Sequence, residues 1–563
     1  MFLLLIVIPL FSLGLSNHGL WSADEPRVAE IGREMALTGN WAVPTLNEKP
    51  FLEEPPLYYG ALALIFKVFG VSDKVARIPS AFFSLATVLV LFFVANSIYG
   101  PRIALLSGII LATTGEYFRV AHWVVVDSAL TFFVVSTMAL SISGYLAENS
   151  RKKLVWYSLM YVAATLAFYS KGFIGIVIPG LGILAFLVAE RNFKEILRMR
   201  LWLGALIFVV MTLPWFIALW QQAGTEYLNV FFMHNHLQRF LPAGMAGRIS
   251  GSSSGHHHPL YYYLVEFPIG FLPWSLLLIP VFIHAFSKAG KPETQSAKGL
   301  LFAKCWFFAG LIFLSIASTK RMLYLMPIFA PMAMLTAMYI SSTVTSQSLK
   351  RLGKVFLWIY TIVLLAVGVS ATPVYVFVKG IYPWIVATNL FSLAFIFSLF
   401  MVTFSIGAAW FLWHGNPRRY WAANTTSIIA GMVFAAVVVA PLMDRHKSFV
   451  PFCQDVMATV PHDQTFFAYN PDETLRGAVP FYTEHYLAEL NDLNSIHKIA
   501  EAEEPFFIMI RDKRHKDEDA LLSTGRLSVF FQKKMGIDRT LTVFKKNNYK
   551  EPGKIRLTQK MPD

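Results

Sequence analysis

The stretch PSAFFSLATVLVLFFVANS, residues 79–97, contains no charged side chain. A helix rises about 1.5 Å per residue, so this stretch is long enough to cross a hydrocarbon core about 30 Å thick. The sequence therefore predicts an α-helical polytopic membrane protein with about 13 transmembrane helices, the first of them a retained N-terminal span rather than a cleaved signal. The other predicted spans cover residues 1–16, 103–116, 128–147, 154–170, 173–189, 201–220, 263–284, 300–317, 322–342, 353–378, 383–413 and 420–442.

The composition excludes an ordinary soluble protein, because 56% of the 563 residues are hydrophobic and only 15% are charged. The two cysteines, Cys305 and Cys453, form neither a disulfide framework nor a metal-binding spacing. The net charge is +14, but residues 444–563 carry about as many acids as bases. The excess positive charge therefore lies in the membrane part, where it indicates topology and contact with anionic membrane lipids rather than nucleic acid.

Lysine and arginine gather in every second short loop between the predicted spans. Cytoplasmic loops are enriched in these residues, so the loops mark the cytoplasmic side of a plasma membrane. The opposite, external side then receives nearly every polar residue suited to chemistry. The basic loops lie at residues 151–153, 191–200, 288–298, 350–354 and 418–419. The polar residues assigned to the external side are Asp24, Glu25, Glu53, Glu54, Asp127, Lys171, His234, His236, Arg239, Lys320 and Arg321.

The predicted domains follow from this topology. Residues 1–443 form a transmembrane domain, with a first external loop at 17–78 and a flexible, Gly/Ser-rich external loop at 221–262. Residues 444–563 form a small external α/β domain, because β-branched and aromatic runs alternate there with helical pieces. The expected strands are 465–470, 505–512, 527–534 and 541–547, and the expected helical pieces lie around 485–502 and 515–523.

The first external loop contains DEPRVAEIGREM, residues 24–35. Pro26 suits the first turn of a helix, and Val28 and Ile31 begin an apolar stripe that predicts a short amphipathic helix lying on the membrane surface. Asp24 and Glu25 stand at its amino end, where exposed amides and the helix dipole favour negative charge. This pair is either a helix cap or the acidic part of a site.

A second acidic pair, Glu53 and Glu54, follows in FLEEPPLYYG, residues 51–60. Four carboxylates in one loop near the bilayer repel one another unless cations or a metal balance them. The cations assigned to the same side are Arg27, Lys49, Lys171, Arg239, Lys320 and Arg321.

Five segments together resemble bacterial C-type glycosyltransferases related to the protein O-mannosyltransferases, a family that includes the lipid A aminoarabinose transferases. The segments occur in the expected order over about the first 335 residues. They are DEPRVAEIGREMALTGNWAVPTLNEKPFLEEPPLYY (24–59), VVVDSALTFF (124–133), FYSKGFIG (168–175), HNHLQRF (234–240) and STKRMLYLMPIFAP (318–331).

The resemblance implies an enzyme of a bacterial inner membrane that has its site on the periplasmic face. It would transfer a sugar, with inversion, from a polyprenyl-phosphate carrier to a hydroxyl of an envelope glycolipid or glycan, lipid A with an aminoarabinose donor being the best match. Asp24 would be the general base, and Asp127 would orient the substrate. Lys171, Lys320 and Arg321 would hold the lipid phosphate. The other implied substrate-binding residues are Glu25, Arg27, Glu54, Arg239 and Tyr324, and a divalent metal ion would use Glu53 and His236.

The chain departs from the aminoarabinose transferases at one position. They carry Glu-Lys-Pro where this chain has Glu53-Glu54-Pro55, and their lysine is expected to contact the lipid phosphate. Three alternatives stay open: transfer to protein or to another envelope glycan, a lipid-linked sugar flippase or transporter, and a non-catalytic assembly protein. The flippase is the less favoured of these, because its ionisable groups are expected near the bilayer midplane rather than at one interface.

Overall fold

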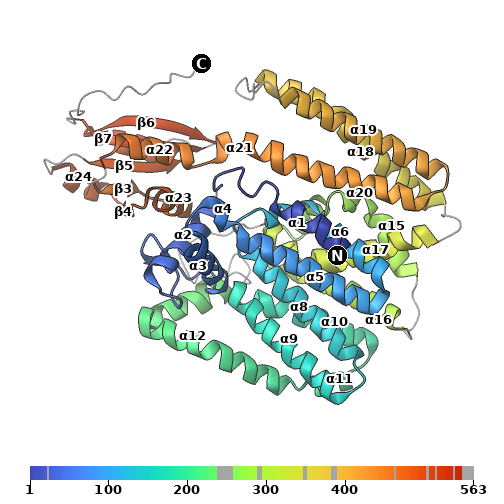
Figure 1. Cartoon of the computed structure of the whole chain (residues 1–563). Helices are drawn as coiled ribbons and strands as arrows, with labels where there is room; N and C mark the ends of the chain where they lie inside the picture. The colour runs from blue at the N-terminus through green and yellow to red at the C-terminus, as the bar shows by residue number, and fades with distance from the viewer. Residues whose placement is uncertain are drawn as a thin grey trace. The chain divides into compact units, whose positions relative to one another are not determined.

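The structure is a computed structural model (Figure 1). It describes residues 1–21, 24–237, 258–287, 294–345, 351–381, 390–461, 464–501, 506–513, 516–536 and 539–547, with the backbone alone at 234–237 and 445. The chain divides into two compact units. The first comprises Met1–His18, Gly32–Thr45 and Pro50–Leu442, and the second comprises Gly19–Ile31, Leu46–Lys49 and Met443–Asp563.

The first unit is helical. Eight of its helical segments in the described residues are long and apolar enough to cross a membrane, and two bent helix pairs raise the number to as many as ten. Its helices are α1 (Phe2–Ser12), α3 (Leu57–Phe69), α4 (Asp73–Ala76), α5 (Ile78–Tyr99), α6 (Pro101–Ala112), α7 (Gly115–Ala121), α8 (Asp127–Leu146), α9 (Ser150–Lys171), α10 (Ile174–Glu190), α11 (Lys194–Met199), α12 (Leu201–Asn229), η1 (Val230–Leu237), α14 (Tyr262–Gly270), η3 (Trp274–Leu277), α15 (Leu278–Ser287), α16 (Gln295–Ile316), η4 (Met322–Leu325), α17 (Met326–Thr345), α18 (Arg351–Ile381), α19 (Leu390–Trp413), α20 (Pro417–Phe434) and η6 (Ala435–Val439).

The multi-span membrane character predicted from the sequence is confirmed, whereas the exact number of thirteen spans is not established. Helix α1 has 11 residues, and at about 1.5 Å per residue it reaches only about half-way across a hydrocarbon core. Helices α6 and α7 form one bent pair with an angle of 71°, and residues 262–287 form the other with an angle of 110°.

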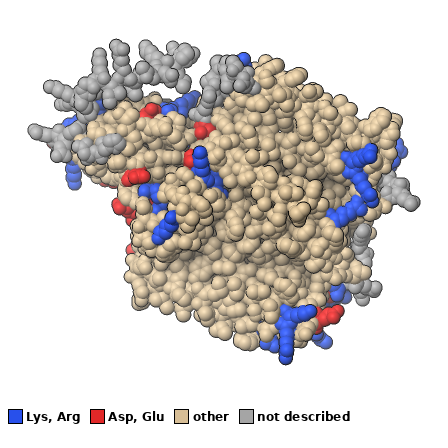
Figure 2. All heavy atoms as spheres, viewed as in Figure 1, with Lys and Arg blue, Asp and Glu red and all other residues tan. Residues whose placement is uncertain are grey.

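Helix α17 lies at the centre of the first unit. Its neighbours include α6, α16 and α8, and 89% of the apolar window in Met322–Thr345 is buried. By contrast, α12 and α19 are mostly exposed, and their outward side chains include Val210 and Phe395. The face drawn in Figure 2 consists largely of uncharged residues. Apolar outer helices around a buried central helix are what a lipid solvent requires.

The second unit contains a five-stranded sheet with strand order β4-β3-β5-β7-β6. Strand β3 pairs in parallel with β4 and β5, whereas β5 with β7 and β6 with β7 pair antiparallel. Its elements are α22 (Val450–Thr459), β3 (Phe466–Tyr469), α23 (Glu473–Thr483), β4 (Leu487–Leu490), α24 (Leu493–Glu501), β5 (Phe507–Asp512), α25 (Lys516–Leu522), β6 (Leu527–Met535) and β7 (Arg539–Lys546). Helix α21 (Ala440–Lys447) crosses the division between the units.

Strand β5 shows why this sheet is covered on both faces. Phe507 and Met509 belong to the apolar cluster that contains α22 and α23, whereas Ile508 and Ile510 belong to the cluster that contains α24 and α25. Successive side chains of a strand point to opposite faces, so a continuous apolar run fits a strand between two helical layers.

Three sequence-based predictions need correction. The helical piece expected at 485–502 begins with strand β4, because these residues pair with β3. The external loop expected at 221–262 is helical as far as Leu237, and residues 238–257 lie outside the described part of the chain. Helix α2 (Asp24–Thr38) does not expose the charged face expected of an amphipathic helix, because its charged residues from Asp24 to Glu34 are buried together with its apolar stripe.

Candidate active site

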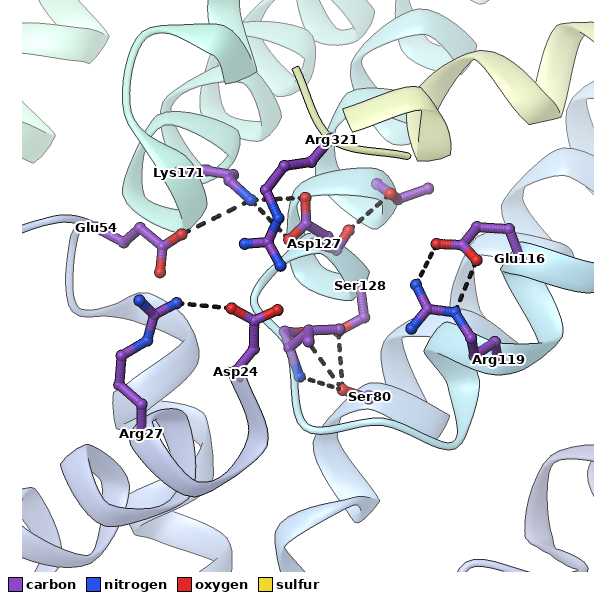
Figure 3. Close-up of polar contacts among 12 residues, drawn as sticks. Asp24, Arg27, Glu54, Ser80, Glu116, Arg119, Asp127, Ser128, Lys171 and Arg321 are labelled. Carbon is purple, nitrogen blue, oxygen red and sulfur yellow. Dashed lines mark hydrogen bonds and ion pairs between the residues drawn. The ribbon is translucent and has the colours of Figure 1, made fainter. Parts of the chain in front are cut away.

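The first unit buries an ion pair between two helix ends (Figure 3). Asp127 begins α8 and Lys171 ends α9, and the lysine Nζ donates to both carboxylate oxygens at 2.7 and 2.6 Å. The two side chains are 3% and 8% exposed. Each charge suits its helix end, since a helix dipole favours an anion at the amino end and a cation at the carboxyl end. Gly172, with φ 73°, ends α9 immediately after the lysine.

Glu54 is a second carboxylate beside the same lysine. Its Oε1 lies 3.7 Å from the Nζ of Lys171, and its Oε2 accepts a hydrogen bond of 3.0 Å from the hydroxyl of Tyr59. Tyr59 lies in α3, directly after the prolines that precede this helix. The position at which the aminoarabinose transferases carry a lysine is therefore occupied here by a carboxylate that faces Lys171.

Arg321 and Tyr324 complete this cluster. The hydroxyl of the buried Tyr263 accepts from the backbone N–H of Arg321 and donates to its carbonyl oxygen, at 3.2 and 3.1 Å. With its backbone held in this way, Arg321 directs its guanidinium towards Asp127 and Lys171 (Figure 3). The ring of Tyr324 lies 5.0 Å from the Nζ of Lys171, within range of a cation–π interaction.

Lys320, also predicted to hold the lipid phosphate, binds backbone oxygens in this structure. It is 2% exposed, and its Nζ donates to the carbonyl oxygens of Ala317 and His258 at 2.6 and 2.9 Å. Burial lowers the pKa of Lys320. Two of its three donors bind backbone oxygens, so the geometry favours a structural role over phosphate binding.

The second unit holds the acidic residues of the opening segment. Asp24, in the first turn of α2, is 5% exposed, and its Oδ1 accepts from Nη2 of Arg27 at 3.0 Å. Arg27 also donates through Nη1 to the carboxylate of Glu473 in α23, so one guanidinium joins two carboxylates. Glu25 is fully buried and accepts from the backbone N–H of Trp21 at 2.9 Å, which stabilises the entry to the helix.

The two residues predicted to hold a metal ion are only partly described. Glu53 is half-buried, and among the described residues no group of three or more His, Cys, Asp or Glu side chains lies close enough to hold an ion. The side chain of His236 and all of Arg239 lie outside the described residues.

Sequence reasoning missed several residues of these clusters. Tyr59 and Tyr263 orient Glu54 and Arg321, and Glu473 binds Arg27 from 446 positions away. The pair of tyrosines in FLEEPPLYYG was the only local signal, because the other contacts exist only once distant segments pack together.

Known proteins with similar sequences agree with the resemblance inferred from the motifs. Residues 53–218 match the family described as Dolichyl-phosphate-mannose-protein mannosyltransferase. An undecaprenyl phosphate-alpha-4-amino-4-deoxy-L-arabinose arabinosyl transferase from Enterobacter sp. (strain 638) is 30% identical over 375 residues, 65% of each chain. A second such transferase, from Proteus mirabilis (strain HI4320), is 28% identical over 388 residues, 67% of each chain. The chain thus spans slightly less than two thirds of the length of the Enterobacter relative.

The fold also has a solved counterpart. The crystal structure of ArnT from Cupriavidus metallidurans bound to undecaprenyl phosphate superposes with a TM-score of 0.73 at 20% identity, covering 96% of this chain and 97% of that one. The structure of the same protein in the apo state gives a TM-score of 0.74 at 19% identity. At this level of identity the likeness concerns the fold.

Proposed function

We propose that this chain, a relative of the aminoarabinose transferases in sequence and of ArnT in fold, is a glycosyltransferase that uses a polyprenyl-phosphate-linked sugar. Its donor would be an undecaprenyl-phosphate aminoarabinose, and its acceptor a hydroxyl of lipid A. The observation that carries the proposal is the buried Lys171, held between two carboxylates with Arg321 directed at the same cluster. Burying a lysine inside a membrane protein costs free energy unless anionic groups bind it. A buried ionisable residue of this kind therefore indicates a functional site.

The reaction breaks the bond between the anomeric carbon of the sugar and the phosphate oxygen, and it forms a bond from that carbon to the acceptor oxygen. The acceptor proton passes to Asp24, the proposed base. The departing phosphate gains negative charge, so Arg321 and Lys171 would stabilise it in the transition state. Asp127 would hold Lys171 in place rather than take the proton, because both of its oxygens already accept from the lysine.

Arg27 gives the Asp24 carboxylate a defined orientation, because its Nη2 donates to Oδ1 of Asp24 at 3.0 Å. The carboxylate of Glu473 accepts from Nη1 of the same guanidinium. The two contacts of Arg27 therefore favour a base with a fixed orientation.

The site would face the periplasm in a topology of about 13 crossings. The support is the placement of lysine and arginine in alternate loops, on the side opposite the acidic motifs. Single cysteines introduced at exposed positions of residues 151–153 and 418–419 should react with a membrane-impermeant maleimide only after the inner membrane is opened. Labelling of both positions in intact spheroplasts would contradict this orientation.

The divalent-metal site at Glu53 and His236 stays a prediction from the resemblance. Carboxylate and imidazole ligands suit zinc or manganese, and such an ion would supply positive charge next to a phosphate. Metal analysis of the purified protein, with Glu53→Gln and His236→Ala as controls, decides the matter. A metal content of about one ion per chain that falls in both variants supports the site, and equal content in all three rejects it.

Mass spectrometry of lipid A tests the proposed function. Cells that carry the gene should contain lipid A with added aminoarabinose, and cells without it, or with Asp24→Asn, should not. Purified protein with undecaprenyl-phosphate aminoarabinose and lipid A should reproduce the transfer. Unchanged lipid A together with an altered envelope glycan or protein would instead support the same chemistry on another acceptor, and a change in lipid-linked sugar distribution without any transfer would support a flippase.

A further inference from the structure

Helix α23 of the sheet-containing unit presents one face to the first turn of α2, and both segments belong to the second unit. Glu473 and Gly477 are four residues apart, so they lie on the same face of α23. The carboxylate of Glu473 binds Arg27. A Cβ on Gly477 would lie 2.5 Å from the backbone carbon of Pro26 and 2.6 Å from the backbone nitrogen of Arg27. This approach is therefore a backbone contact that only glycine permits.

Further contacts within the second unit hold the residues that precede α2. The hydroxyl of Tyr482, near the end of α23, accepts from the backbone N–H of Leu20 at 2.7 Å. Asp444 accepts from the backbone of Gly19 and from the indole of Trp21, at 2.9 and 2.7 Å. These contacts hold the backbone that precedes Asp24, and the carboxylate of Glu473 binds the guanidinium that also binds the Asp24 carboxylate.

We propose that Glu473 is a positioning residue for the reaction, acting through Arg27 on Asp24. Bound on both sides, the guanidinium keeps one orientation and presents Nη2 to Oδ1 of Asp24. Without the second carboxylate, Arg27 turns more fully onto Asp24, and its guanidinium then competes with the acceptor hydroxyl for the Asp24 carboxylate. The domain of residues 444–563 thereby contributes to the catalytic step. This inference rests on the proposed role of Asp24 as the base.

The test uses the full-length protein purified in detergent, with undecaprenyl-phosphate aminoarabinose and lipid A as substrates. Glu473→Gln keeps the size of the side chain and removes its charge. It should lower kcat at least tenfold and leave the KM of both substrates within twofold of the wild type, because the proposal gives Glu473 a role in orienting the base and none in binding substrate. The control is Glu501→Gln in α24, whose carboxylate is 71% exposed and lies 3.7 Å from Arg526, and its kcat should equal that of the wild type.

A double variant separates positioning from general destabilisation. In an Arg27→Lys background, Glu473→Gln should change kcat by less than twofold, since the residue through which it acts has already been altered. A further tenfold loss in that background would overturn the proposal, as would a kcat for Glu473→Gln equal to that of the control. If the glutamine variant does not fold, Glu473→Asp decides: a reduced kcat with unchanged KM supports the proposal, and the control value of kcat rejects it.

Asp24→Asn distinguishes the two levels of inference. If this variant is inactive and Glu473→Gln is fully active, only the positioning role is wrong. If Asp24→Asn retains full activity, the proposed base is wrong, and the positioning role is rejected with it.

Discussion

The buried pair of Lys171 and Asp127 leads to a quantitative prediction. Substitution Lys171→Met keeps an unbranched side chain of similar length but removes the charge that neutralises Asp127 and Glu54. From N–O distances of 2.6 and 3.7 Å, the gross Coulomb attractions are about 6 and about 4 kcal/mol at an effective dielectric constant of 20. Desolvation of the ions offsets part of this attraction, and breaking a buried pair by removing one partner typically costs about 3–5 kcal/mol. We expect Lys171→Met to lose about that much stability.

The two carboxylates should respond unequally. Asp127→Asn leaves Lys171 with Glu54 at 3.7 Å and with the ring of Tyr324, so its loss of stability should be the smaller one. In the double variant Lys171→Met/Asp127→Asn, the uncompensated carboxylate at position 127 is gone. The double variant should therefore be more stable than Lys171→Met alone, although Asp127→Asn is destabilising in the wild-type background.

Unfolding of the purified protein in mixed detergent micelles, followed by tryptophan fluorescence as the denaturing detergent increases, measures all four proteins under one set of conditions. A matched control is Lys67→Met, since Lys67 lies at the end of α3, where its Nζ packs over the ring of Trp41 and is in no ion pair shown by the described residues. If Lys171→Met lies within about 0.5 kcal/mol of this control, or if the double variant is less stable than Lys171→Met, the electrostatic argument is wrong.

Three further predictions concern residues outside this pair. Lys320→Met removes two charged hydrogen bonds to backbone oxygens and should lower the free energy of unfolding by about 2–4 kcal/mol. A variant with wild-type stability would instead favour a role of Lys320 in phosphate binding. Gly477→Ala should destabilise the second unit by at least about 1–3 kcal/mol, because the added Cβ meets the backbone of Pro26, whereas Gly407→Ala in α19, where nothing lies within 4 Å, should not. Burial alone would raise the pKa of Glu489, but hydrogen bonds from Lys49 and Asn47 and the charge of Arg476 lower it overall. Glu489 therefore contributes stability above its unfolded pKa of 4.5 that is lost as the pH falls through the lower folded value, and Glu489→Gln should flatten acid unfolding measured by circular dichroism in that range.

The sequence alone determined the features that depend on local composition. An uncharged run such as 79–97 is long and apolar enough to be a membrane helix wherever its neighbours lie, because the lipid is its solvent. The helix at Asp24 and the one that follows the prolines after Glu54 were also readable, since first-turn acids and prolines act within a few residues. Lys171 was assigned to the external side from the placement of the basic loops, as one of the cations able to balance the acidic loop.

Tertiary structure decided which of these charges meet. Lys171 and Asp127 are 44 positions apart, and Arg27 and Glu473 are 446 positions apart, so no local pattern relates either pair. Strand β4 likewise depends on tertiary structure, because it forms by pairing with β3. The ammonium of Lys320 binds one carbonyl oxygen of its own segment and one from residue 258, and only the fold brings these two oxygens together. Helix periodicity and hydropathy are set by neighbours along the chain, whereas the partner of a buried charge is set by how the helices and the sheet pack, and packing is a property of the whole chain.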